Sequence, residues 1–278
     1  MTAAMASVPY RSGSVGIEYR LLNAERRHAP LLVFLHEGLG SLSAWRDFPA
    51  WLCDAAGLRG LVYSRPGYGR STPRPRDELW PPTYMHEQAR DLLPALLASL
   101  GIDTQADPPW LLGHSDGGSI ALIFAATFPR SVAGVITLAP HIFVEDLSIA
   151  SIRAARAAYL MGALRDRLAR HHADPDSAFW GWNDVWLDPE FRSWNIESLL
   201  PRIVCPVLAV QGRDDEYGTL AQIQGIGRAV PQAKLLALNT CGHAVHRDQP
   251  DRVTRAVVEL VARHTRPMRS EPWIPSPS

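Results

Sequence analysis

The feature that most constrains this chain is a short apolar run that ends at a serine between two glycines. Residues 110–112 lead into Gly113-His114-Ser115-Asp116-Gly117, and residues 119–128, which carry no charge, follow up to Pro129. This succession predicts a buried strand, a sharp turn at the serine and a helix packed closely on a sheet, ended by the proline. Small residues two positions before and after the serine avoid clashes in such a turn. The pattern is typical of a nucleophile elbow.

The rest of the chain alternates between strand and helix patterns. An alternating stretch at 15–21, after the turn-like residues 12–14, predicts an antiparallel hairpin at the start of a sheet. Short apolar runs suited to strands buried on both faces lie at 31–35, 60–63, 110–112, 132–138, 206–210 and 234–238. Helical patterns lie at 44–56, 84–100, 115–128, 219–230 and 251–264. The predicted fold class is therefore α/β, with a mostly parallel sheet covered on both faces and ligands bound outside the carboxyl ends of its strands.

One segment, residues 141–203, breaks the alternation because helical patterns follow one another there without a strand. We expect an inserted helical cap, with the core formed by residues 1–140 and 204–265 and an irregular tail over 266–278. The segment is rich in aromatic residues, most of which should form a small core of its own. Some should face the cleft, because ligand sites are lined mainly by apolar and aromatic groups. The candidate substrate-binding residues are Leu39, Trp180, Trp182 and Trp186.

Two further segments supply partners for the serine. Gly212-Arg213-Asp214-Asp215 follows the strand pattern at 206–210, and Cys241-Gly242-His243 follows the one at 234–238. A serine hydroxyl is a poor nucleophile until a base takes its proton, and the base needs an acid to hold its tautomer. Ser115 and His243 fit the first two roles, and Asp214 or Asp215 fits the third.

The order serine, acid, histidine resembles that of the α/β-hydrolase superfamily. The resemblance runs from about residue 15 to residue 264 and includes the motifs His36-Glu37-Gly38-Leu39-Gly40 and Ser64-Arg65-Pro66-Gly67-Tyr68-Gly69-Arg70-Ser71. It favours Asp215 over Asp214, because the family acid usually lies three residues after the glycine. It also implies that the backbone N–H of Gly38, with Leu39 as the neighbour to check, joins the N–H of Asp116 in an oxyanion hole.

Two acidic side chains of these motifs need separate expectations. Glu37 stands where the family usually has glycine, and we expect it to brace the loop by hydrogen bonds rather than to act in catalysis. The carboxylate of Asp116 either accepts hydrogen bonds in the first turn of the following helix or faces the acyl pocket, where it would attract an ammonium group.

These residues predict a serine hydrolase that cleaves a small carboxylic ester through an acyl-enzyme. No cofactor and no metal are expected, since residues 65–71 lack the lysine of a phosphate-binding loop and His171 and His172 cannot both face one side of a helix. A carbon–carbon bond hydrolase of the meta-cleavage type and a thioesterase are alternatives. A non-catalytic small-molecule receptor on the same fold is the alternative from another class.

Charge and composition exclude several other classes of function. The 28 basic and 28 acidic residues balance, and without a long basic run neither nucleic acid nor an anionic membrane is an expected partner. Three widely spaced cysteines indicate a reducing compartment. No secretory signal or membrane-spanning run is recognised, so we expect a cytoplasmic protein whose partner is its small ester substrate. The oligomeric state stays open.

Overall fold

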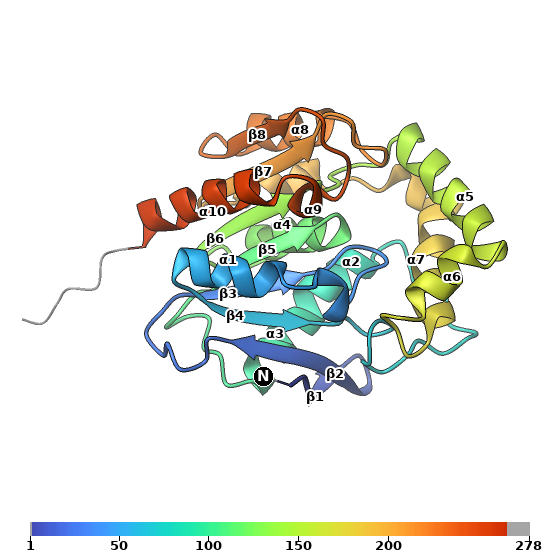
Figure 1. Ribbon diagram of the computed structural model, residues 1–278, viewed down its shortest axis with the longest axis horizontal. Coiled ribbons are helices and arrows are strands. Elements are labelled where there is room, and N and C mark those ends of the chain that lie inside the picture. The colour runs from blue at the N-terminus through green and yellow to red at the C-terminus, as the bar shows by residue number, and fades with distance from the viewer. Residues whose placement is uncertain (1, 266–278) are drawn as a thin grey trace, which may run out of the picture.

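The computed structural model describes residues 2–265, and the irregular tail expected over 266–278 lies outside them. Within the described residues, eight strands form one sheet in the order β1-β2-β4-β3-β5-β6-β7-β8 (Figure 1). Their bounds are β1 Ala4–Tyr10, β2 Gly13–Leu22, β3 Leu31–Leu35, β4 Arg59–Tyr63, β5 Trp110–His114, β6 Gly134–Leu138, β7 Val207–Gly212 and β8 Lys234–Leu238. The β1–β2 hairpin is antiparallel, β2 is antiparallel to β4, and the pairs from β4 to β8 are parallel. The predicted hairpin and mostly parallel sheet are confirmed.

Helices cover both faces of the sheet, as predicted (Figure 1). One face carries α1 Phe48–Ala56, α9 Val245–Asp248 and α10 Pro250–His264, and the other carries α2 Tyr84–Glu87, the π-helical turn η2 Gln88–Leu92, α3 Leu93–Ser99, α4 Asp116–Thr127 and α8 Ala221–Ala229. Side chains of β5 alternate between the two cores, because Trp110 and Leu112 pack with α1 and α10 whereas Leu111 packs on the other side. Strands buried in this way read as continuous apolar runs.

Two helices differ in detail from their sequence patterns. The pattern at 44–56 divides into a short 3-10 helix, η1 Ser43–Trp45, and α1, because Arg46 has φ 54° and so leaves the helical region. The pattern at 84–100 passes through the π-helical turn η2 just before Pro94. A wider turn accommodates a proline, which lacks an N–H and clashes with the preceding turn of a regular α-helix.

Residues 141–203, which we call the inserted segment, lie between β6 and β7. They form α5 Asp146–Leu160, α6 Ala163–Leu168, α7 Pro175–Leu187 and the 3-10 helices η3 Pro189–Ser193 and η4 Glu197–Arg202. In Figure 1, α5, α6 and α7 lie together beyond one end of the sheet. The side chain of Asp174 caps α7 by accepting from the N–H groups of Asp176 and Ser177, each at 3.0 Å.

Hydrogen bonds attach the inserted segment to the core loops. The Nδ1 of His172 accepts from the N–H of Gly69 at 3.0 Å, so its Nε2 carries the proton and donates to the carbonyl of Leu39 at 3.1 Å. Ser177 Oγ donates to the carbonyl of Gly67 at 3.0 Å. The segment is therefore fixed against the loops that follow β3 and β4.

Among residues 2–265 there is no helix with the length and apolar character to cross a membrane.

Candidate active site

Ser115 lies at the turn between β5 and α4 in a backbone conformation that few non-glycine residues adopt. Its φ is 52° and its ψ is −119°. A Cβ added at Gly113 would lie 2.0 Å from the carbonyl oxygen of Gly117, and one added at Gly117 would lie 2.0 Å from that of Leu35. Both motif glycines are therefore required, because the backbones of β3, β5 and α4 touch here. The strained strand–turn–helix expected from the sequence is present.

His243 and Asp215 meet beside this turn. His243 follows β8, and its Nδ1 lies 2.9 Å from Oδ1 and 3.0 Å from Oδ2 of Asp215. The loop after β7 holds the carboxylate, since the N–H groups of Tyr217 and Gly218 donate to Oδ1 at 2.8 and 3.2 Å. Asp214, the alternative acid, is exposed, and its N–H donates to the carbonyl of Cys241 at 3.0 Å. Of the two aspartates, Asp215 is the one that contacts the histidine.

The two groups shift each other's pKa in the directions that a base and its orienting acid need. Burial alone would lower the pKa of His243, but the hydrogen bond and the charge of Asp215 outweigh burial and raise it above its ordinary value. Burial alone would raise the pKa of Asp215, but His243 and the backbone donors lower it. Asp215 therefore stays ionised and stabilises a protonated His243.

Ser115 and His243 line one cavity of about 240 Å³. Gly38, Leu39, Trp182 and Trp186 also line it, so most of the sequence-predicted site residues come together. Trp182 and Trp186 share one face of α7 because they are four residues apart.

The structure places Trp180 outside this cavity. Two residues before Trp182, it lies roughly 200° further round the helix. There its ring contacts Tyr159 and Phe179 edge to face, at centroid distances of 5.6 and 5.0 Å. The guanidinium of Arg156 lies 5.4 Å from the centre of its ring. Trp180 thus belongs to the aromatic packing of the inserted segment.

The loop after β3 is held rigidly next to Ser115. The backbone N–H of Arg65 donates to Nε2 of His36 at 3.0 Å, so the imidazole carries its proton on Nδ1 and donates to the carbonyl of Glu37 at 2.7 Å. The buried guanidinium of Arg65 donates to the same carbonyl at 2.9 Å. Within the described residues, no hydrogen bond is donated by the N–H of Gly38 or of Leu39. Both N–H groups are free to bind a substrate oxygen.

Glu37 connects this loop to the serine turn. Its carboxylate lies 3.4 Å from Nδ1 of His114, the residue before Ser115. Burial would raise the pKa of Glu37, but His114 lowers it well below its ordinary range, so the side chain is ionised. A Cβ on Gly40 would lie 2.4 Å from the same carboxylate, which explains the glycine there. The structure places Glu37 as a contact between the loop and the turn.

Asp116 follows neither of the two alternatives considered for its side chain. Its carboxylate is fully buried, accepts from the hydroxyl of Tyr84 at 2.6 Å and from Nε1 of Trp186 at 3.3 Å, and lies 3.8 Å from the guanidinium of Arg65. Among residues 2–265, its hydrogen-bond donors are these two side chains and no backbone N–H of α4, and Asp116 does not line the catalytic cavity. Its backbone N–H, at the first position of α4, has no carbonyl of the helix to bind.

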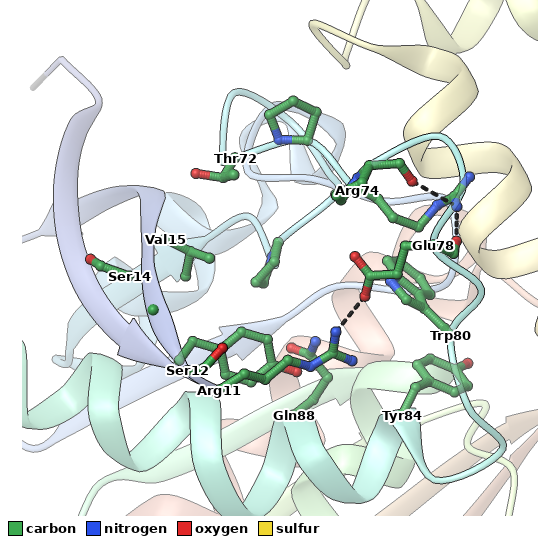
Figure 2. A pocket seen from close by; sticks show the side chains of 16 residues that line it. Arg11, Ser12, Ser14, Val15, Thr72, Arg74, Glu78, Trp80, Tyr84 and Gln88 are labelled. Atoms are coloured by element: carbon green, nitrogen blue, oxygen red, sulfur yellow. Dashed lines mark hydrogen bonds and ion pairs between the residues drawn. The ribbon is translucent and has the colours of Figure 1, made fainter.

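Tyr84 also borders a second cavity, of about 250 Å³. Figure 2 shows this cavity with the side chains of Trp80, Tyr84 and Gln88 around it, next to the ion pair of Arg11 with Glu78. Neither Ser115 nor His243 lines it. The second cavity is therefore separate from the candidate active site, and Tyr84, which lines it, donates to the carboxylate of the residue that follows Ser115.

His141 is a site residue that sequence reasoning missed. It follows β6 after Ala139, whose φ is 48°, and Ser119 Oγ donates to its carbonyl at 2.6 Å. Its ring centre lies 5.9 Å from that of His243 and 4.9 Å from that of Trp186. Burial lowers the pKa of His141 to about 3, so the ring is neutral. Its position just past the carboxyl end of a predicted strand, as for Asp215 and His243, was the available signal.

Among the described residues no cluster of histidine, cysteine, aspartate and glutamate is arranged to hold a metal ion.

A model of the alpha/beta hydrolase family matches residues 32–256. A putative carbamate hydrolase, RutD, from Pseudomonas savastanoi pv. phaseolicola is 28% identical over 274 residues, which cover 89% of this chain and 99% of the relative. A 2-hydroxy-6-oxo-6-phenylhexa-2,4-dienoate hydrolase from Burkholderia cepacia is 23% identical over 83% of this chain and 87% of its own length. A thermophilic esterase from Thermogutta terrifontis has the same fold, with a TM-score of 0.74 and 19% identity over 95% of this chain and 100% of that one.

Proposed function

Because the chain belongs to the alpha/beta hydrolase family, we propose that it is a serine hydrolase that cleaves a small carboxylic ester through an acyl-enzyme on Ser115. The observation that carries this proposal is the contact of His243 Nδ1 with both oxygens of Asp215, at 2.9 and 3.0 Å, beside a strained serine in the same cavity. A base held by an ionised acid next to a serine is the arrangement that activates a hydroxyl group.

In the proposed reaction, Ser115 Oγ attacks the ester carbonyl while His243 Nε2 takes its proton. The oxyanion of the tetrahedral intermediate accepts hydrogen bonds from the N–H of Asp116 and from that of Gly38, with the N–H of Leu39 as the neighbouring donor. The protonated His243 then gives its proton to the leaving alcohol, and the acyl group stays on Ser115. A water molecule, deprotonated by His243, releases the acid and restores the serine.

The dimensions of the cavity support a small substrate. Its volume is about 240 Å³, and the indole rings of Trp182 and Trp186 supply apolar wall. The similarity to a hydrolase named for a 6-oxo dienoate supports carbon–carbon bond cleavage as the second candidate, and the similarity to a putative carbamate hydrolase adds carbamates to the substrates worth testing. Both chemistries can use the same serine, histidine and acid.

The test is burst release of nitrophenol from a 4-nitrophenyl ester, together with covalent capture of Ser115 by a fluorophosphonate. Ser115→Ala and His243→Ala should each lower kcat by several orders of magnitude, because members of such a unit act together. Asp215→Asn should also be damaging, whereas Asp214→Asn, its matched control, should keep near wild-type kcat.

Three results would count against the proposal. Retention of more than about a tenth of kcat by Ser115→Ala would remove the serine from the mechanism, since base and covalent catalysis together exceed tenfold. Sensitivity of Asp214→Asn in place of Asp215→Asn would move the acid by one residue. Binding of small esters with neither burst nor labelling would favour a receptor on this fold.

A further inference from the structure

A groove of about 590 Å³ adjoins the catalytic cavity where the inserted segment meets the core. Leu164 and Leu168 of α6 form part of its wall, and Ala44 of η1 faces them from the core. Glu37, Leu39, Arg167 and Arg247 line both the groove and the catalytic cavity. A substrate that fills the cavity can therefore extend directly into the groove.

Four arginines converge on this groove from separate parts of the chain. Arg46 lies between η1 and α1, Arg167 and Arg170 lie on α6 and just after it, and Arg247 lies on α9. Within the part of the chain that the structure describes, the guanidinium groups of Arg46, Arg167 and Arg170 form no ion pair and no side-chain hydrogen bond. That of Arg247 donates to the carbonyl of Ala44 at 2.9 Å. In a chain with 28 basic and 28 acidic residues, this is a local concentration of unpaired positive charge.

The residues that line the groove include fewer acids than arginines. Glu37 is the one acid among the ten lining residues, and its carboxylate lies 3.4 Å from His114. His171 also lines the groove. Burial lowers the pKa of His171, and the charges of Arg46, Arg170 and Arg247 lower it further, whereas the charge of Glu37 acts in the opposite direction. Like charges brought together in this way repel one another unless an anion joins them.

Building on the proposed ester hydrolysis, we infer that this groove binds an anionic group, a carboxylate or a phosphate, on the part of the substrate that extends out of the catalytic cavity. A guanidinium group presents paired N–H donors that match the oxygens of either anion. Because Arg46 and Arg247 belong to the core whereas Arg167 and Arg170 belong to the inserted segment, the anion would contact both parts together. The groove therefore selects among esters that the cavity accepts equally.

The test compares kcat/KM for matched esters in the full-length protein. One set consists of butyrate esters of 3-(4-hydroxyphenyl)propionamide, of 3-(4-hydroxyphenyl)propionate and of 2-(4-hydroxyphenyl)ethyl phosphate, which place a neutral amide, a carboxylate or a phosphate on the alcohol. The other set is 4-nitrophenyl hemiglutarate and its methyl ester, which place the charge on the acyl group. In at least one set the anionic ester should exceed its neutral partner about tenfold at low salt. The excess should fall toward unity at about 0.5 M NaCl, because salt screens exposed charges.

Two arginines that line the groove but not the catalytic cavity are the sites to change. Arg46→Gln and Arg170→Gln should each lower the ratio of anionic to neutral kcat/KM about two- to fivefold, as expected for exposed charge pairs. Arg153→Gln, an exposed arginine of α5 that lines neither space, is the matched control and should leave the ratio unchanged.

The outcomes separate this inference from the proposed function. Absence of burst and of Ser115 labelling would overturn ester hydrolysis itself. Turnover of all the esters with equal kcat/KM for charged and neutral partners, or an anionic preference that Arg46→Gln and Arg170→Gln leave intact, would overturn the anion groove alone. A preference confined to the carboxylate or to the phosphate ester would identify which anion the groove takes.

Discussion

Tyr84→Phe tests the buried network behind the serine turn. The hydroxyl of Tyr84 donates to the carboxylate of Asp116 at 2.6 Å and accepts from Nε1 of Trp186 at 3.0 Å. All three side chains are buried. Removing this hydroxyl takes a partner from a buried carboxyl group, and leaving a buried polar group without its partner costs about 1 to 3 kcal/mol. The free energy of unfolding should fall by that amount. The loss should not be larger, because Trp186 and Arg65 remain near the carboxylate.

Urea unfolding followed by tryptophan fluorescence measures the loss. The midpoint should decrease with an unchanged dependence on urea, because the surface exposed on unfolding stays the same. Tyr63→Phe is the matched control. Tyr63 is fully buried on β4, and its hydroxyl has no hydrogen-bond partner among the described residues. Its removal should be neutral or stabilising. Equal losses for Tyr84→Phe and Tyr63→Phe would refute the network argument.

Three further predictions concern the site. The kcat/KM should fall on the acid side with an apparent pKa above 6.5, because protonation of His243 removes the base, and Asp215→Asn should move this limb to lower pH in a pH–rate profile. Gly117→Ala should yield no folded protein by circular dichroism, since the new Cβ would lie 2.0 Å from a backbone oxygen of β3; a wild-type spectrum would contradict this. Trp182→Phe should raise KM for a 4-nitrophenyl ester several-fold while Trp180→Phe leaves it unchanged, and equal effects would undo the assignment of cavity faces.

The sequence by itself determined the strands of the sheet and which strand ends are followed by candidate catalytic residues. Burial on both faces produces continuous apolar runs in β3, β5 and β6, and a close approach of three backbones demands glycine at 113 and 117. Each of these signals is local, because it depends on residues a few positions apart. The same local signal, a polar residue just past a strand, indicated His243 and the Asp214–Asp215 pair, and it also applies to His141.

Only the tertiary structure decided which side chains share a space. Asp116 meets Tyr84 and Trp186, which lie 32 and 70 residues away, and no pattern around Asp116 indicates either contact. Trp182 lines the cavity and Trp180 does not, because the two side chains lie on different faces of α7. The helical periodicity of α7 does not by itself determine which of these faces is directed toward Ser115. The arginine groove depends in the same way on how α6 packs against η1 and α9. Such contacts form between segments that are far apart in the chain, and their energies depend on the packing of whole elements. They therefore produce no pattern at a fixed spacing in the sequence.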